Sequence, residues 1–229
     1  MRKFFKRIIS FFLVPLTRWY LRKERQYSYL GVTVKVFSGV FHPGLFYSTT
    51  FLINFLLAQK IRNKSLLELG CGTGLLSIIS AKNGAVVTAS DLSHQAIKNI
   101  TSNAVQNQAK ITIIYSDLFD RIEQKPFDWI VINPPYYARS PKNEAELAWH
   151  CGQEFEYFKK LFSTLGNYTH VNSQVIMVLT LGCELDKIFE IAKINQFSFE
   201  LLQEKNVLFD GKDFLYRIRS VNSSEKVQA

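Results

Sequence analysis

The four residues Asn133-Pro134-Pro135-Tyr136 combine groups that can hold and orient a flat, nitrogen-containing ligand. The asparagine oxygen can accept a hydrogen bond from an amide or amine, and the tyrosine ring can stack on a planar group. Because neither proline can donate a hydrogen bond to a neighbouring strand, the pair should end the apolar strand predicted at 127–132 and stiffen the following turn. The alternative is an ordinary strand exit in which Asn133 has a structural role.

Three alternating glycines, at positions 70, 72 and 74, separate a short apolar strand from a helical pattern that begins at Leu75. Such a loop allows a tight turn and a close approach of the backbone to a ligand at the start of a helix. The dinucleotide-binding fingerprint would have Gly or Ala at position 75, so Leu75 argues against NAD. Glu68, near the end of the strand, would repel a pyrophosphate and attract a cation. A zwitterionic ligand with an ammonium group therefore fits this loop better.

Two further predicted strands also run into acids. Strand 86–91 ends in Asp91, about twenty residues after the glycines, which is the spacing at which a carboxylate meets a ribose diol. The strand that begins at Ile111 runs into Asp117, which is placed to accept a hydrogen bond from an adenine amino group. Aspartate is also common in turns and at helix N-caps, so Asp117 by itself has a structural alternative. The order of the strand ends is more specific than either acid, because ligands of α/β sheets bind at the carboxyl edge.

Strands and helices alternate along the rest of the chain. Four further helices are predicted at 48–59, 93–108, 154–165 and 184–194, and Ser93 is the predicted N-cap of the second. Three further strands are predicted at 174–179, 197–203 and 213–220. This alternation, with a closing pair of strands, predicts an α/β fold with a mostly parallel sheet and helices on both faces.

The chain resembles class I S-adenosylmethionine-dependent methyltransferases of the group that modifies planar nitrogens, through its glycine loop and the signature at 133–136. That group includes N6-adenine methyltransferases and release-factor glutamine methyltransferases. The resemblance covers about residues 40–219 and implies a Rossmann-like fold with a seven-stranded sheet. Residues 148–152 are similar to a segment of the glutamine-modifying enzymes, although Cys151 replaces the first of its two glycines.

The resemblance also implies which residues would bind the cofactor, S-adenosyl-L-methionine. It implies that Glu68, Gly70, Gly72 and Gly74 hold the methionine part and that Asp91 binds the ribose. It further implies that Asp117 and Leu118 flank the adenine and that Thr49 or Thr50 binds the carboxylate. The two threonines follow a Pro-containing loop that resembles one in the family, and the choice between them stays open.

The chemistry of a planar nitrogen explains the predicted catalytic residues Asn133, Pro134 and Tyr136. The lone pair of such a nitrogen is delocalised into the neighbouring π system, so the nitrogen is a poor nucleophile. Hydrogen bonds from it to the Asn133 oxygen and the Pro134 carbonyl would favour a pyramidal nitrogen and stabilise the developing charge. Stacking of Tyr136 on the target would contribute about 1–3 kcal/mol. Positioning, rather than a His or Cys nucleophile, would supply much of the acceleration.

Positive charge is concentrated at the start of the chain. Residues 1–40 hold nine of the 28 Lys and Arg residues and one of the 19 acidic residues, so they carry +8 of the net charge of +9. The segment is basic and amphipathic, and its apolar run, interrupted by Pro15, is too short to span a bilayer. Three alternatives fit it: a helix docked on the domain, a phosphate-binding segment, and an anchor on anionic lipid. We expect a leader at 1–40, a methyltransferase domain at 41–221 and a polar tail at 222–229.

Composition is consistent with one globular domain in a reducing compartment. The 229 residues, 47% of them hydrophobic, can bury a substantial core without disulfides. The three cysteines and four histidines show no metal-ligand spacing. We therefore expect no metal site, a cytoplasmic location and a monomer.

The predicted function is methyl transfer from S-adenosylmethionine to adenine in ribosomal or transfer RNA, or to a glutamine amide of a release-factor protein. The basic leader favours RNA. The bacterial release-factor enzymes carry a sizeable helical substrate domain in this place, so the short N-terminal region argues against them. The similarity at 148–152 favours glutamine, so both substrates stay open. The alternative from another class is a non-catalytic adaptor that keeps the cofactor fold and binds RNA or a membrane surface, and an oxidoreductase is a third.

Overall fold

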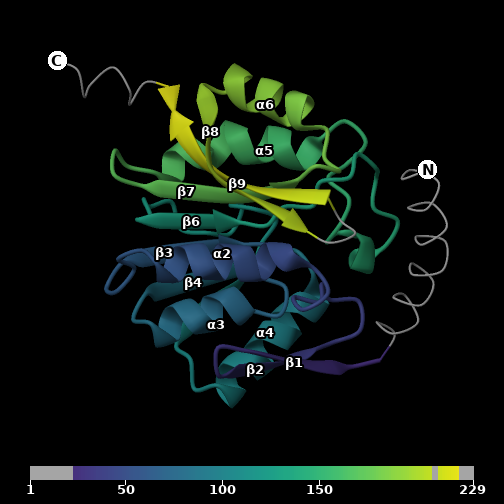
Figure 1. Ribbon diagram of the computed structural model, residues 1–229, viewed down its shortest axis with the longest axis vertical. Coiled ribbons are helices and arrows are strands. Elements are labelled where there is room, and N and C mark those ends of the chain that lie inside the picture. Colours follow the sequence, from purple (N-terminus) through teal and green to yellow (C-terminus); the bar gives the residue numbers. More distant parts are fainter. Residues whose placement is uncertain (1–22, 208–210, 222–229) are drawn as a thin grey trace.

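A seven-stranded sheet forms the centre of the computed structural model, which describes residues 23–207 and 211–221 (Figure 1). The strand order is β5-β4-β3-β6-β7-β9-β8, and β9 runs antiparallel to both of its neighbours while the other pairs are parallel. The strands are β3 (Ser65–Leu69), β4 (Val86–Asp91), β5 (Ile111–Tyr115), β6 (Trp129–Ile132), β7 (Gln174–Thr180), β8 (Phe197–Val207) and β9 (Gly211–Ser220). The predicted mostly parallel sheet with a closing pair is confirmed.

Helices cover both faces of this sheet, as predicted. On one face lie α2 (Tyr47–Leu57), α3 (Leu75–Lys82) and α4 (His94–Gln106), and on the other lie α5 (Glu156–Thr164) and α6 (Leu185–Ile194) (Figure 1). Two short 3-10 helices, η1 (Glu144–Glu146) and η2 (Leu165–Tyr168), flank α5 in sequence. The layers place the hydrophobic core on both sides of the central strands.

Strand β6 shows why the central strands lack a polar face. All four of its residues are buried. Ile130 and Ile132 pack in the cluster under α5 and α6, whereas Trp129 and Val131 pack in the cluster under α2 and α3. A strand covered on both faces requires apolar residues at successive positions, which is the pattern seen at 127–132. The strand begins at Trp129, two residues later than predicted, because the Asp128 N–H donates to the Ser65 hydroxyl, at 2.9 Å, and not to a backbone carbonyl of a neighbouring strand.

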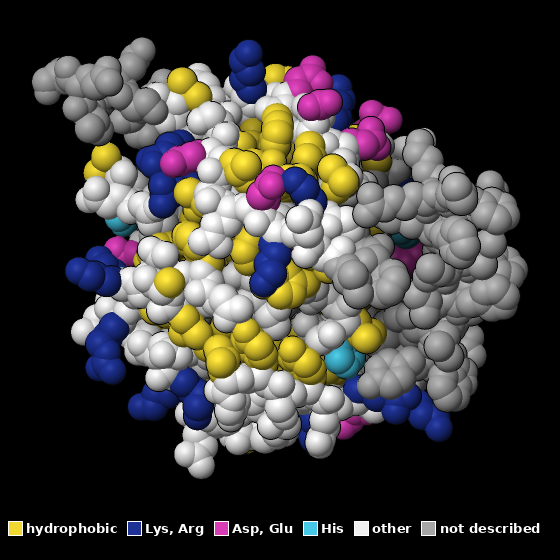
Figure 2. All heavy atoms as spheres, viewed as in Figure 1, with side chains coloured by type: hydrophobic (Ala, Val, Ile, Leu, Met, Phe, Trp, Pro, Cys, Tyr) yellow, Lys and Arg dark blue, Asp and Glu magenta, His cyan; other side chains and the backbone are white. Residues whose placement is uncertain are grey.

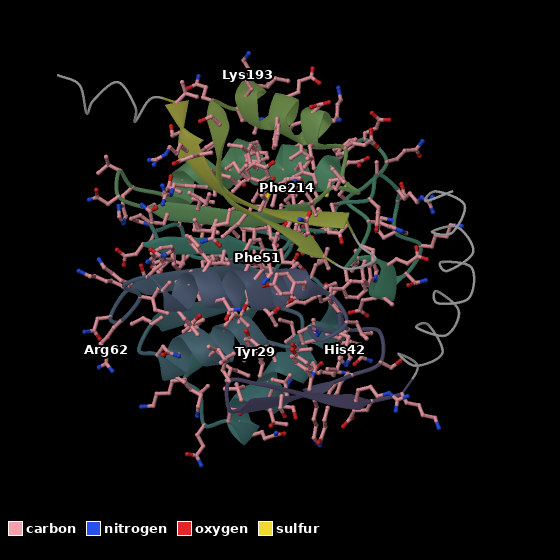
Figure 3. The ribbon with its side chains drawn as sticks, viewed as in Figure 1. Tyr29, His42, Phe51, Arg62, Lys193 and Phe214 are labelled. Carbon is pink, nitrogen blue, oxygen red and sulfur yellow. The ribbon has the colours of Figure 1, made fainter. Side chains whose placement is uncertain are left out.

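A β-hairpin lies within the segment predicted as a basic leader. Its strands, β1 (Arg25–Tyr29) and β2 (Val32–Val36), pair antiparallel. Asn103 of α4 accepts a hydrogen bond from the Lys35 N–H at 2.8 Å, and Asn99 accepts one from the Phe37 N–H at 3.0 Å. The Tyr29 hydroxyl, on the side chain labelled in Figure 3, donates to Asn54 of α2 at 2.8 Å. The hairpin is therefore attached to the helical layer.

Some predictions concern residues that the structure does not describe. Residues 1–22 of the predicted leader and the predicted tail at 222–229 lie outside the described ranges. The three alternatives for the leader, a docked helix, a phosphate-binding segment and a lipid anchor, therefore stay predictions. The predicted N-cap of α4 does lie inside the described ranges. The Ser93 hydroxyl accepts a hydrogen bond from the Ala96 N–H at 3.1 Å, which confirms that prediction.

Candidate active site

A cavity of about 150 Å³ lies at the carboxyl ends of the parallel strands. Ten of the twelve predicted site residues line it, and these are Thr49, Glu68, Gly70, Gly72, Asp91, Asp117, Leu118, Asn133, Pro134 and Tyr136. Gly74 and Thr50 are not among its lining residues. The sheet thus brings together residues from four strand ends and from α2, because parallel strands end at the same edge.

The glycines of the loop have different surroundings. Gly70 and Gly72 line the cavity and have φ angles of +76° and +51°, a region that residues with side chains rarely adopt. Gly74 precedes α3 with a φ of +77°, and a Cβ atom there would clash with the Ile100 side chain of α4. Gly74 therefore allows α3 and α4 to pack closely, a packing requirement that spacing in the sequence did not distinguish from ligand binding.

Glu68 is a buried carboxylate near the end of β3. Its Oε2 atom accepts hydrogen bonds from the backbone N–H of Ser77, at 3.0 Å, and from the Ser77 hydroxyl. Desolvation raises the pKa of Glu68 to about 8, against the effect of these hydrogen bonds, and the negative charge of Asp91 adds to the rise. No Lys, Arg or His of the described ranges contributes to stabilising its charge. A cationic group of a ligand would do so.

Asp91 connects the end of β4 with the glycine loop and with the start of α4. Its Oδ2 accepts a hydrogen bond from the Gly72 N–H and its Oδ1 accepts one from the Ser93 N–H, each at 2.9 Å. Desolvation raises the pKa of Asp91, while these hydrogen bonds act in the opposite direction. Each carboxylate oxygen has a second lone pair. The side chain can therefore accept further hydrogen bonds from hydroxyl groups in the cavity.

The residues after β5 form the side of the cavity next to α5. Asp117 Oδ2 lies 2.6 Å from Lys160 Nζ, and the same lysine lies 2.7 Å from Asp120 Oδ2. Leu118 is buried and presents an apolar surface. Tyr157 of α5 also lines the cavity, and desolvation raises the pKa of its phenol, which keeps the hydroxyl protonated. This side combines an apolar surface with hydrogen-bonding groups, as a purine would require.

Adjacent residues at the start of α2 face two different cavities. Thr49 lines the large cavity, whereas Ser48 lines a second cavity of about 10 Å³, which is room for roughly one water molecule. Thr50 is buried, and its hydroxyl donates to the Tyr47 carbonyl at 2.9 Å. Of the two threonines proposed as alternatives from the sequence, Thr49 is the one in contact with the large cavity.

The Asn133–Tyr136 turn separates these two cavities. Asn133 and Tyr136 line both of them. The Asn133 Nδ2 atom donates a hydrogen bond to the Ser48 hydroxyl at 3.2 Å. The two prolines restrict the backbone of the turn. Pro134 is buried and Pro135 is half-buried, so packing against the rest of the protein also fixes its position. The turn therefore presents Asn133 and Tyr136 at the edge of the large cavity.

The loop after the turn folds back over the large cavity. Glu144, Leu147 and Ala148 line it, and Glu144 Oε1 accepts a hydrogen bond from the Gln95 N–H at 3.3 Å, at the start of α4. Sequence reasoning missed Glu144, Leu147, Ser48 and Tyr157, because single residues in loops and on helices carry no spacing signal. The similarity noted at 148–152 pointed to this loop without identifying its contacts.

The described residues contain neither a membrane-spanning helix nor a cluster of metal ligands. No helix in residues 23–207 and 211–221 is long and apolar enough to cross a lipid bilayer. In the same ranges, no three His, Cys, Asp or Glu side chains gather where they could hold a metal ion. The cavity itself is lined by acids, an amide, backbone groups and aromatic rings.

Two curated relatives share sequence with this chain. The putative protein N5-glutamine methyltransferase of Methanocaldococcus jannaschii is 37% identical over 111 residues, which are 48% of this chain and 54% of that protein. The release factor glutamine methyltransferase of Lactococcus lactis subsp. lactis is 38% identical over 181 residues, which are 73% of this chain and 66% of that protein. The chain thus spans about half to two thirds of these proteins.

The fold is shared with solved methyltransferase structures. The T. thermophilus 16S rRNA N2 methyltransferase, solved in complex with AdoMet and guanosine, superposes with a TM-score of 0.63 at 20% identity, covering 86% of this chain and 50% of that one. This likeness establishes a Rossmann-like methyltransferase fold, as the sequence predicted. The family model described as Methyltransferase small domain matches residues 31–173, which is more than half of the chain. The chain belongs to the Methyltransferase small domain family.

Proposed function

We propose that this protein transfers a methyl group from S-adenosylmethionine to a planar nitrogen of a macromolecule, with a glutamine side-chain amide as the first candidate acceptor. The observation that carries the proposal is that Asn133, Pro134 and Tyr136 line one cavity together with acids and glycines that suit the cofactor. The names of the M. jannaschii and L. lactis relatives support glutamine as the acceptor.

The residues that line the large cavity suit the groups of S-adenosylmethionine. Glu68 would bind the ammonium group, whose charge would favour ionisation of this buried acid. Asp91 would accept hydrogen bonds from the ribose hydroxyls, Asp117 one from the adenine amino group, and Thr49 would bind the carboxylate. A Cβ atom on Gly70 would approach no neighbour closer than 3.9 Å, so the space beside this backbone is open to a ligand. The bound cofactor would supply a methyl group on a positively charged sulfur.

The turn would bind the acceptor nitrogen. The Asn133 Oδ1 atom and the Pro134 carbonyl would accept its two N–H groups, which opposes delocalisation of the nitrogen lone pair. Tyr136 would stack on the plane of the amide or base. None of these interactions distinguishes a glutamine amide from an adenine amine, because both are flat and carry two N–H groups.

Adenine in RNA is the second candidate acceptor, because residues 1–40 carry a net charge of +8. A segment of this charge would bind phosphates through interactions that weaken as the salt concentration rises. If RNA is the substrate, deleting residues 1–24 should weaken substrate binding and make the activity less sensitive to salt. With a glutamine acceptor, the deletion should leave the salt dependence unchanged.

A labelling experiment tests the proposal and separates the two acceptors. Purified protein is incubated with methyl-labelled S-adenosylmethionine and an extract of cells that lack this protein, so that the acceptor is unmethylated. We expect label that protease removes and ribonuclease does not. Label removed by ribonuclease alone would exclude glutamine in favour of RNA. Absence of macromolecular label would favour a non-catalytic adaptor. Equal labelling by an Asn133→Ala variant would exclude the catalytic role proposed for Asn133.

A further inference from the structure

We infer that Ser48 is a positioning residue for methyl transfer, whose hydroxyl holds the Asn133 amide so that its Oδ1 atom faces the acceptor nitrogen. The inference rests on the proposed function of Asn133. The two residues are 85 positions apart in sequence and meet where α2 begins and β6 ends. The contact between them is a half-buried side-chain hydrogen bond of 3.2 Å.

The need for such a contact follows from the two faces of an asparagine amide. One side of the amide is a carbonyl oxygen that accepts hydrogen bonds, and the other is an NH₂ group that donates them. Asn133 donates from Nδ2 to Ser48, which directs its Oδ1 atom away from the serine. If the amide rotated by half a turn, its NH₂ group would face the N–H groups of the acceptor, and two donors cannot form a hydrogen bond. The orientation of this amide therefore decides whether the acceptor nitrogen is bound.

The Ser48 hydroxyl has no competing role as a helix cap. Serine near a helix start commonly bonds to the first backbone N–H groups. Here the N-cap position of α2 is Phe46, and no side chain caps the helix. Ser48 lies within the first turn of α2, which is anchored to the core by buried residues such as Leu52 and Phe55. The hydroxyl is thus carried by a rigid element and directed at Asn133.

Its neighbour Thr49 provides an internal comparison. Ser48 lines the small cavity beyond the Asn133–Tyr136 turn, and Thr49 lines the large cavity assigned to the cofactor. Removing the Ser48 hydroxyl should therefore slow methyl transfer without weakening cofactor binding. Removing the Thr49 hydroxyl should weaken cofactor binding. Two adjacent residues would then differ in which step they affect.

The test is a double-mutant cycle between Ser48→Ala and Asn133→Ala. The rate of methyl transfer is measured in single turnovers at saturating labelled S-adenosylmethionine, with the extract described above, and the Kd of the cofactor is measured by calorimetry. We expect Ser48→Ala to slow transfer on the order of 10-fold with a cofactor Kd within twofold of the wild type. In the Asn133→Ala background, Ser48→Ala should cause no further loss, because the amide it orients is gone.

The control is Ser163→Ala on α5, whose hydroxyl bonds to the Lys160 carbonyl of its own helix. This variant should transfer methyl groups at the wild-type rate. The inference is overturned if Ser48→Ala transfers at the wild-type rate, if its cofactor Kd rises as much as its rate falls, or if its effect is undiminished in the Asn133→Ala background. A wild-type protein that labels no macromolecule would instead refute the proposed function.

Discussion

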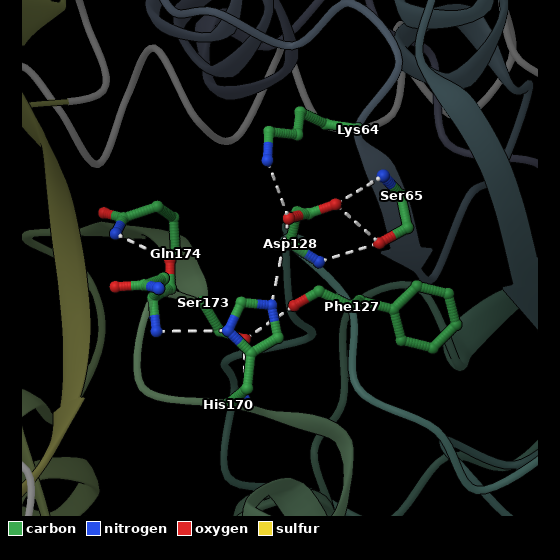
Figure 4. A network of polar contacts seen from close by, with 8 residues as sticks. Lys64, Ser65, Phe127, Asp128, His170, Ser173 and Gln174 are labelled. Atoms are coloured by element: carbon green, nitrogen blue, oxygen red, sulfur yellow. Dashed lines mark hydrogen bonds and ion pairs between the residues drawn. The ribbon is translucent and has the colours of Figure 1, made fainter.

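Asp128 and Glu68, two acids at opposite ends of the central strands, have opposite surroundings. At the amino end, Asp128 accepts hydrogen bonds from the Ser65 N–H, the Ser65 hydroxyl and Lys64 Nζ at 2.9, 3.0 and 3.1 Å (Figure 4). Desolvation opposes ionisation of Asp128, but these hydrogen bonds outweigh it and lower its pKa. At the carboxyl end, desolvation of Glu68 prevails and raises its pKa to about 8. The amino-end network is satisfied internally, whereas the carboxyl end retains capacity for a ligand.

The surface near Asp128 carries cationic side chains. Figure 2 shows Lys and Arg side chains along the left edge of the view, the edge on which Figure 3 labels Arg62. The loop that carries Arg62 also carries Lys64, which pairs with Asp128. Cations therefore support the acid at the amino end. We therefore expect Asp128 to contribute to stability and Glu68 to ligand binding.

The largest effect is expected from Asn133→Ala at the carboxyl end. Loss of an oxygen that stabilises developing charge should slow methyl transfer roughly 100- to 1000-fold. The free energy of unfolding and the cofactor Kd should change little, because the side chain is half-buried and bonds to Ser48 alone among the side chains of the described ranges. Single-turnover labelling and calorimetry measure these quantities. A variant that loses cofactor affinity instead of rate would contradict the assigned role.

The opposite profile is expected from Asp128→Ala at the amino end. Removing a carboxylate that accepts hydrogen bonds from Ser65 and Lys64 should lower the free energy of unfolding by about 2 kcal/mol. Because the folded state lowers the Asp128 pKa, this contribution is present at neutral pH and is lost as the pH falls through the folded value. Denaturant titrations at pH 7 and at acidic pH measure it. Loss of cofactor affinity in this variant would break the comparison between the two ends.

Replacing Glu68 with glutamine should reduce cofactor affinity by about 2 kcal/mol, since a charged hydrogen bond to the ammonium group is lost. The wild-type Kd should fall as the pH rises from 6 towards 8, because Glu68 must ionise and its pKa is about 8. The Kd of Glu68→Gln should lack this part of the pH dependence. Calorimetry across this range tests both expectations, and an identical pH profile for the two proteins would exclude Glu68 as the ammonium ligand.

The same substitution should stabilise the ligand-free protein at pH 8. The folded pKa of Glu68, about 8, lies well above 4.5, the usual value of a glutamate, so between these values the folded state retains a proton that the unfolded state releases. Rising pH therefore favours unfolding across this window. Glutamine carries no such proton, so Glu68→Gln should have the higher Tm at pH 8 despite its weaker binding. A lower Tm would show that losing the hydrogen bonds between Ser77 and the carboxylate costs more stability than is gained by removing the desolvation of the carboxylate.

The smallest effect is expected from Lys160→Met. Lys160 gives Asp117 a cationic partner, as Lys64 does for Asp128, but both Lys160 and Asp117 are partly exposed. Ion pairs of this exposure contribute less than about 1 kcal/mol. We expect the cofactor Kd to rise by about two- to fivefold, because Asp117 is held less firmly. The control Lys187→Met removes an exposed pair with Glu190 on α6 and should leave the Kd unchanged.

Much of the fold and of the candidate site was predictable because the signals are local. The apolar run before the turn at 133–136 predicted a central strand, since a strand covered on both faces has no polar positions. The three glycines predicted a tight turn, and all three have positive φ angles, which residues with side chains rarely adopt. Strands followed by Glu68, Asp91 and Asn133 predicted one binding edge, because parallel strands end together. The residues do line one cavity.

The tertiary structure decided what depends on contacts between distant segments. Gly74 is needed for packing because Ile100 of α4 crosses over it. Thr49 rather than Thr50 reaches the large cavity, because successive residues of a helix point about 100° apart and the start of α2 sets their directions. Local spacing thus determined which residue types reach the sheet edge. The meeting of Ser48 with Asn133 was decided by how α2 packs beside β6, a relation that no spacing along the chain encodes.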